Sequence, residues 1–264
     1  MDFETPAGAP FGGQLRYWRQ VKGLSQLELA HRAETTPRHL SFIETGRSRP
    51  GRDVVLRIAE CLELPMRARN DLLQAAGLPP AYPERDLDDD ALAPFIDGIR
   101  ALLEAHAPNP AAAFDELGRV RLANATYRRL SPGVEERTPE EIVDLFYGEV
   151  GRGLVVNWAE VAWMTAQRRL RNAIASGSAE QLRLAERARA LVAEVAQPDM
   201  TGSEASPLIC PRLRVGAEVV ETYSVVVRFE TAQDVTLSEL RVELTYPTDA
   251  AGAEVFRKLG DEPP

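Results

Sequence analysis

The sequence is poor in the residues that most enzymes and metal proteins use. It has two cysteines and three histidines among 264 residues, and only 6% of its residues are aromatic. His106 is the only histidine beyond residue 90, in the second predicted domain, so a metal site or a catalytic triad is poorly supplied there, and haem held by His106 is a weak alternative. No glycine-rich phosphate loop occurs. We therefore expect no enzyme activity and no cofactor.

Other absences concern the compartment. No stretch of about 18 apolar residues exists, so we expect no membrane-spanning helix. The acidic, Gly/Pro-rich start lacks the basic and apolar segments of a secretory signal. Cys61 and Cys210 fall in different predicted domains, and Cys61 lies on an apolar helix face, which favours a small core residue over half of a disulfide. These features predict a cytoplasmic protein.

The charge is divided unevenly. A net charge of −9 would argue against nucleic acid, but nine Arg/Lys and four Asp/Glu lie between Gly13 and Ile58, a net of +5. Residues 81–264 carry 20 basic and 31 acidic residues, a net of −11. A basic head on an acidic body is directed towards phosphate by its own field.

The stretch between Ser25 and Pro50 predicts two short helices joined by a tight turn. Ser25 and Thr36 are N-cap residues, Pro37 occupies a first helical position, and Gly46 ends the second helix. Two helices so close in sequence must cross steeply, which is the geometry of a helix-turn-helix.

The apolar positions of the two helices predict how they pack. Leu27, Ala30 and Ala33 are placed on one face of the first helix at i, i+3 and i+6. Leu40 and Ile43 point inward from the second helix. Its other face is then free to enter a DNA major groove.

At these residues the chain resembles known families. GLSQLELA, RHLSFIETGRSRP and LRIAECLELP resemble the five-helix, lambda-repressor-like DNA-binding domain of phage repressors and the bacterial XRE group, over roughly residues 12–78. RHLSFIETGRSRP, PNPAAAFDE and the pair Asn157-Trp158 resemble the MmyB-like transcription regulators over nearly the whole chain. One departure is Glu34, where the turn usually has glycine; a left-handed backbone there would cost on the order of 1 kcal/mol.

The DNA contacts are predicted at the start of the first helix, on the second helix and its cap, and on the basic loop. Arg38 is in the first helical turn, where arginine can pair with guanine, and Phe42 either touches a thymine methyl or packs on the loop or the second domain. Gln26 resembles a glutamine that binds phosphate, and the loop arginines are expected on the DNA backbone. The full set is Gln26, Thr36, Arg38, His39, Ser41, Phe42, Arg47, Arg49 and Arg52.

The second half predicts an α+β domain. Strands are expected over Ala112–Asp115, Arg119–Ala123, Leu208–Arg214, Thr222–Phe229 and Glu239–Tyr246, because apolar and polar residues alternate there or turn signals bound them. Helical patterns cover residues 95–106, 126–130, 139–146, 158–175, 179–195 and 250–259. We expect a flexible arm over 1–12, the DNA-binding domain over 13–78, a linker over 79–90 and the second domain over 91–264.

The MmyB-like resemblance implies a PAS-like fold, an antiparallel sheet covered by helices, and a pocket that accepts a fatty acid. Such a pocket needs an apolar wall and a cation or hydroxyl for the carboxylate. The candidate residues are Phe114, Trp158, Trp163, Tyr223, Val225 and Val227 for the wall, with Arg228 or Tyr127 for the head group. Plain core packing is the alternative for each of them.

These features together predict a transcriptional regulator. It would bind double-stranded DNA as a homodimer at a pseudo-palindromic site, because one small module makes too few contacts for tight specific binding. Its second domain would sense a small apolar or amphipathic molecule. The alternative is that this domain docks a partner protein and has no small ligand.

Overall fold

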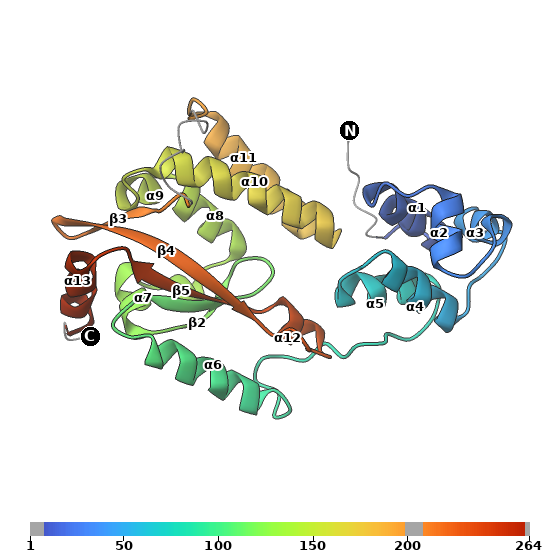
Figure 1. Ribbon diagram of the computed structural model, residues 1–264, viewed down its shortest axis with the longest axis horizontal. Helices are drawn as coiled ribbons and strands as arrows, with labels where there is room; N and C mark the ends of the chain where they lie inside the picture. Colours follow the sequence, from blue (N-terminus) through green and yellow to red (C-terminus); the bar gives the residue numbers. More distant parts are fainter. Residues whose placement is uncertain (1–7, 199–207, 262–264) are drawn as a thin grey trace. The chain divides into compact units, whose positions relative to one another are not determined.

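The computed structural model of the protein describes residues 8–198 and 208–261. The chain divides into two compact units (Figure 1). The first holds the described residues up to Glu84, with 170–182 and 233–235, and the second holds the other described residues. We call the five-helix part of the first unit the head and the second unit the sensor.

The head consists of five helices around one core. They are α1 (Phe11–Val21), α2 (Gln26–Arg32), α3 (Pro37–Glu44), α4 (Arg52–Cys61) and α5 (Met66–Ala75). Trp18, Leu40 and Ile58 are among the side chains that lie fully inside it. Cys61 packs at the edge of this core as a free thiol.

The prediction for Leu27 is wrong. Its side chain is 67% exposed, and Leu29 is buried with Ala30 and Ala33 instead. At 100° per residue, the buried stripe is centred between Leu29 and Ala30, and Leu27 falls more than a quarter-turn away from it.

The turn chemistry predicted for the head is present. The Ser25 hydroxyl accepts from the Glu28 N–H, and the Glu28 carboxylate accepts from the Ser25 N–H, which completes a capping box. Thr36 caps α3 by accepting from the His39 N–H at 3.1 Å. Glu34 adopts a left-handed backbone with φ 50°. The departure from glycine therefore leaves the helix-turn-helix intact.

The sensor is built on a five-stranded antiparallel sheet of PAS-like form. Its strands are β1 (Ala111–Phe114), β2 (Val120–Ala123), β3 (Arg212–Val215), β4 (Glu218–Arg228) and β5 (Arg241–Pro247), in the order β2-β1-β5-β4-β3. The predicted strand over 208–214 is shorter and later than expected, because Pro211 precedes its first paired residue.

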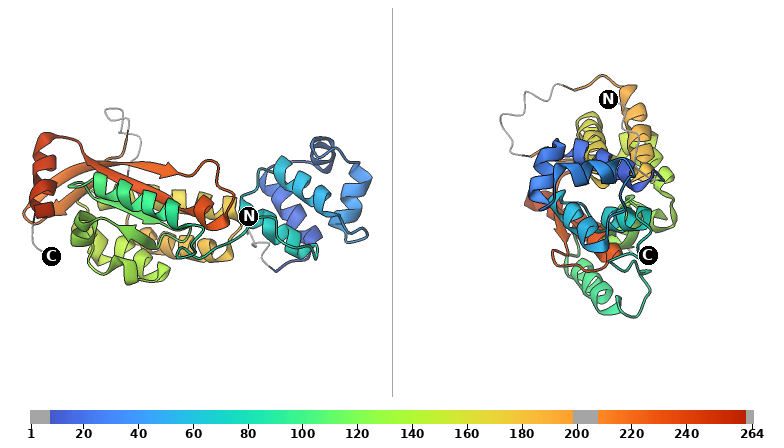
Figure 2. Two further views of the ribbon diagram at one scale, coloured as in Figure 1. Left: turned by 90° about the horizontal axis from the view of Figure 1, so that it is seen from below. Right: turned by 90° about the vertical axis from the view of Figure 1, so that its right-hand side faces the viewer.

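Each face of the sheet has its own cover (Figures 1 and 2). Helix α6 (Ala93–Ala105) packs on the face that carries Ala113, Val242 and Leu244. On the opposite face, Phe114 packs with Tyr127 of α7 (Ala125–Leu130) and with Val134 of the 3-10 turn η1 (Val134–Glu136). Residues of one strand therefore serve two separate cores.

A third cluster lies among the remaining helices. These are α8 (Pro139–Tyr147), α9 (Glu149–Leu154), α10 (Trp158–Ser176) and α11 (Ala179–Ala193). Helices α12 (Val235–Glu239) and α13 (Ala250–Asp261) flank β5 in the chain. Among the residues that the structure describes, no helix is long and apolar enough to cross a membrane.

Candidate nucleic-acid interface and ligand cavity

Helix α3 presents a cationic surface built around one aromatic ring. The Arg38 guanidinium carbon lies 5.3 Å from the centre of the Phe42 ring, and that of Arg47, from the following loop, lies 5.9 Å from it. Arg38 and Arg47 are exposed, whereas Phe42 is half-buried. Phe42 thus packs on the basic loop, as one of the two alternatives predicted, with two cations within about 6 Å of its ring centre.

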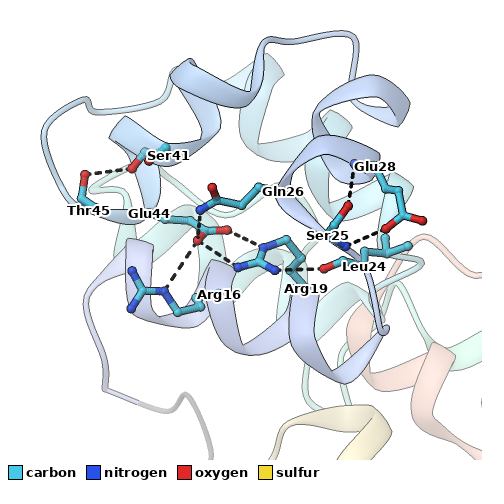
Figure 3. Close-up of polar contacts among 9 residues, drawn as sticks. All are labelled: Arg16, Arg19, Leu24, Ser25, Gln26, Glu28, Ser41, Glu44 and Thr45. Atoms are coloured by element: carbon cyan, nitrogen blue, oxygen red, sulfur yellow. Dashed lines mark hydrogen bonds and ion pairs between the residues drawn. The ribbon is translucent and has the colours of Figure 1, made fainter.

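The position of α3 is fixed by a buried carboxylate (Figure 3). Glu44, at the last residue of α3, accepts from Arg19 Nε at 2.7 Å and from Gln26 Nε2 at 2.8 Å, and it lies 3.6 Å from Arg16 Nε. These partners come from α1 and α2. The network therefore ties the two helices of the motif to each other and to α1.

The charge of Glu44 is stabilised in this site. Burial alone would raise the pKa of Glu44, but hydrogen bonds from Arg19 and Gln26 and the charges of Arg19 and Arg16 outweigh it and lower that pKa. The sequence patterns did not single out Glu44. The sequence could have indicated it, because Glu44 follows Leu40 and Ile43 on the inward-facing side of α3, where a charged residue needs partners.

The other predicted DNA contacts fall into two groups. Ser41 and His39 are half-buried on α3, and Arg49 is exposed in the loop. Arg52 is engaged elsewhere: its Nη1 donates to the Pro79 carbonyl at 2.7 Å. Gln26 keeps one end of its amide on Glu44. The structure thus gathers Arg38, Phe42 and Arg47, and it places Arg52 on the chain that follows α5.

The structure divides the predicted ligand residues among three places. Trp158 and Trp163 pack in the cluster of α8, α10 and α11, where Trp158 Nε1 donates to the Phe146 carbonyl at 2.8 Å. Tyr223, Val225 and Val227 pair with Tyr246, Leu244 and Val242 on the α6 face, whereas Phe114, Tyr127 and Arg228 belong to the opposite face. Val227, expected in the wall, and Arg228, expected at the head group, point to opposite faces, because successive strand residues alternate.

A cavity of about 290 Å³ opens between α6 and strands β4 and β5. That volume is at the lower end of the range for small-ligand pockets. Its walls include Phe95, Ile99 and Leu102 of α6 together with Val227 and Val242 of the sheet, and Arg228 alone is charged among the described residues that line it. Of the predicted ligand residues, only Val227 and Arg228 lie here.

The residues of α6 could have been found from the sequence. Phe95 and Leu102 were assigned to an amphipathic stripe, yet they are 47% and 36% exposed because they border the cavity. The stripe is wider than the contact with the sheet requires. An apolar stripe wider than one packing contact needs could therefore have indicated that part of α6 borders a cavity.

The opposite face of the sheet carries a row of cations. Arg228 and Arg241 are direct cross-strand partners, and the Arg241 guanidinium lies 5.1 Å from the Phe114 ring. Glu243 Oε1 is 3.3 Å from Arg241 Nε. Burial lowers the pKa of Arg241, the charges of Arg169, Arg168 and Arg228 lower it further, and Glu243 opposes them. Burial also raises the pKa of the Tyr127 hydroxyl.

His106 and the pair Asn157-Trp158 have structural contacts. His106 Nε2 donates to the Thr245 carbonyl at 2.8 Å, and its ring packs edge-on against Tyr246. The Asn157 amide accepts from the Arg212 N–H at 2.9 Å and donates to the Cys210 carbonyl at 3.0 Å. These contacts join β3 to the start of α10.

Comparison with known proteins matches two family models. Residues 15–68 match the helix-turn-helix family, and residues 96–259 match the MmyB-like transcription regulator ligand binding domain. No curated protein sequence matches the chain. The two matches fall on the head and on the sensor.

Proposed function

Because the chain belongs to the MmyB-like transcription regulators, as a helix-turn-helix DNA-binding domain joined to a ligand-binding domain, we propose that a fatty acid controls its binding to DNA. The protein binds a pseudo-palindromic operator as a homodimer, and the sensor cavity takes the fatty acid. The observation that carries this proposal is the cavity under α6, whose described lining is apolar except for Arg228, a strand residue that alternates with Val227 and points its side chain to the opposite face of the sheet.

The head supports the DNA half of the proposal. A capped recognition helix, exposed Arg38 and Arg47 on Phe42, and exposed Arg49 form one basic surface. Side chains in the first turn of a recognition helix reach base edges, where arginine can pair with guanine, and phosphate binding requires charge and reach. Two such heads on half-sites about 34 Å apart double the contact with the operator.

Two arginine variants separate base reading from phosphate contact. Arg38→Ala should cost about 2 kcal/mol on the operator and flatten the preference for it, whereas Arg49→Ala should weaken all DNA alike and reduce the salt slope by about 1. Gel-shift titrations at several salt concentrations measure both. Arg100→Ala removes an exposed cation of the sensor and serves as the control. If both head variants behave like that control, the DNA half of the proposal is wrong.

A cavity-filling variant tests the ligand. Gly98 lies in α6, lines the cavity, and has open space where a side chain would begin. Gly98→Leu should abolish binding of myristate without loss of stability, since leucine also favours the helix. Gly153→Leu, in α9 and equally open, is the matched control. Titration calorimetry with myristate measures binding, and retained binding in Gly98→Leu would contradict this site.

The head group is tested separately. Arg228 lines the cavity, yet its side chain points to the opposite face of the sheet, so its expected role as the partner of the carboxylate needs a test of its own. If a carboxylate does bind Arg228, the protein prefers myristate to the uncharged alcohol of equal length, and Arg228→Gln loses this preference. An equal affinity for both in the parent protein would exclude the arginine from recognition.

A second candidate function is the docking of a partner protein, and it is supported by exposed apolar side chains of the sensor. Phe95, Val225 and Val226 are each about half exposed, as in a surface that docks another protein. Native mass spectrometry distinguishes the alternatives, because a bound lipid supports the sensor. No lipid and no thermal shift with fatty acids would favour the docking function.

A further inference from the structure

Strand β4 has a free backbone edge. Its residues Thr222–Arg228 pair with β5 on one side, but β3 pairs only with Glu218–Glu221 on the other. The Thr222 N–H still reaches the Pro211 carbonyl at 2.8 Å, and the described residues place no further strand beyond it. Ser224, Val225, Val226, Val227 and Arg228 are all exposed. This stretch is both an edge and an apolar surface.

The direction of the free groups follows from the pairing. In an antiparallel pair, alternate residues point their N–H and C=O groups to opposite sides of the strand. The Thr222 N–H points away from β5, because it donates a hydrogen bond to the Pro211 carbonyl. The N–H and C=O groups of Ser224, Val226 and Arg228 therefore point to the same side as those of Thr222, and these six groups meet no strand within residues 8–198 and 208–261. A long apolar edge of this kind is a site for pairing with another strand, and native proteins normally cover it.

We propose that this edge is the dimer interface of the sensor, where β4 pairs antiparallel with β4 of a second copy of the chain. The proposal rests on the proposed function only in that the regulator acts as a dimer. It names the surface that joins the two copies.

The pairing is self-complementary in one register. With Val226 opposite Val226 of the second copy, Ser224 lies opposite Arg228 twice, and all six outward groups of each strand are bonded. Val225 then lies opposite Val227 twice on the α6 face of the joined sheet. No like charges oppose each other across the interface. A two-fold axis requires this kind of match, since the same patch must fit itself.

The interface and the cavity share residues. Val227 and Arg228 line the cavity from β4, and both belong to the free edge. A fatty acid seated against Val227 and Arg228 would therefore touch the strand that pairs. This is a direct route by which the ligand biases how two heads are held, since a ligand acts through its different affinity for two states.

Two substitutions of Ser224 test the register in the full-length protein. Ser224 contacts Thr245 in its own sheet and does not line the cavity. Ser224→Arg would place an arginine opposite Arg228 of the second copy at two positions, and it should raise the dimer dissociation constant about tenfold. Ser224→Asp would form an ion pair at the same two positions and should lower the constant several-fold. Sedimentation equilibrium measures both constants, and circular dichroism confirms folding.

A backbone variant tests the edge itself. Val226→Pro removes an outward N–H at the centre of the pairing without removing a hydrogen bond to β5, and a proline is tolerated on an edge whose N–H faces outward. We expect it to weaken the dimer while myristate still binds. A monomer at all concentrations, or a dimer that none of the three variants changes, would overturn the interface. Loss of myristate binding in Gly98→Leu with the dimer intact would concern the ligand site alone.

Discussion

The head and the sensor treat buried charge in opposite ways. In the head, the Glu44 side chain has no exposed surface and receives hydrogen bonds from Arg19 and Gln26. In the sensor, Arg241 lies opposite Arg228 on the neighbouring strand, and the charges of Arg169, Arg168 and Arg228 oppose its own while Glu243 favours it. The hydrogen-bonded network of Glu44 holds the helices of the head in one arrangement. The neighbouring arginines of the sensor repel each other, so a nearby anion stabilises them.

The largest expected effect comes from breaking the satisfied network. Glu44→Ala leaves the guanidinium of Arg19, whose side chain is 13% exposed, without its counter-charge, so it should destabilise the head by about 3 kcal/mol. Hydrogen exchange of the amides of α1–α5 measures this loss locally. Glu60→Ala, an exposed residue of α4, is the control. Equal protection in both variants would show that the network is dispensable.

The same network should make the head sensitive to acid. The folded pKa of Glu44 lies below the ordinary glutamate value of about 4.3, so its contribution is complete above that pH and is lost as the pH falls through the lowered value. Glu44→Gln should flatten the stability curve of the head in that window. The comparison of the variant with the parent chain isolates this group, because other carboxylates titrate in both. An unchanged acid slope would contradict the assignment.

The sensor should respond more weakly to the matching change. Glu243→Gln removes the anion near Arg241 and leaves Arg228 and Arg241 opposed, which should cost about 1 kcal/mol at low salt. Because both side chains of the ion pair are about a quarter exposed, molar salt should remove much of the difference. Urea denaturation at two salt concentrations checks this. A loss as large as that of Glu44→Ala would show that the two networks are alike.

The head was largely readable from the sequence because its signals are local. Ser25, Thr36 and Gly46 specify where helices begin and end, and the structure has them there. Leu27 failed because a helix as short as α2 allows two choices of buried stripe, and only the packing of the other helices decides between them.

For the sensor, the sequence predicted the strands but not the residues that come together around the cavity. The alternation identified β4 and β5 and put Val227 and Arg228 on opposite faces, yet it could not say which helices cover each face or that α6 would line the cavity. Helix α9 was missed because its two glycines, Gly151 and Gly153, weaken any helical pattern. Cavities depend on contacts between distant segments, and no local rule carries that information.

The smallest expected effect concerns the turn of the head. Glu34 has φ 50°, a conformation that costs a side chain on the order of 1 kcal/mol and glycine almost nothing. Glu34→Gly should therefore stabilise the head by about 0.5 kcal/mol, after the greater flexibility of glycine in the unfolded chain is deducted. Gly46→Ala, at φ 72° with open space around it, should do the reverse. Hydrogen exchange can resolve both, and a loss of stability in Glu34→Gly would mean that the glutamate side chain makes a contact worth more than the strain of its backbone.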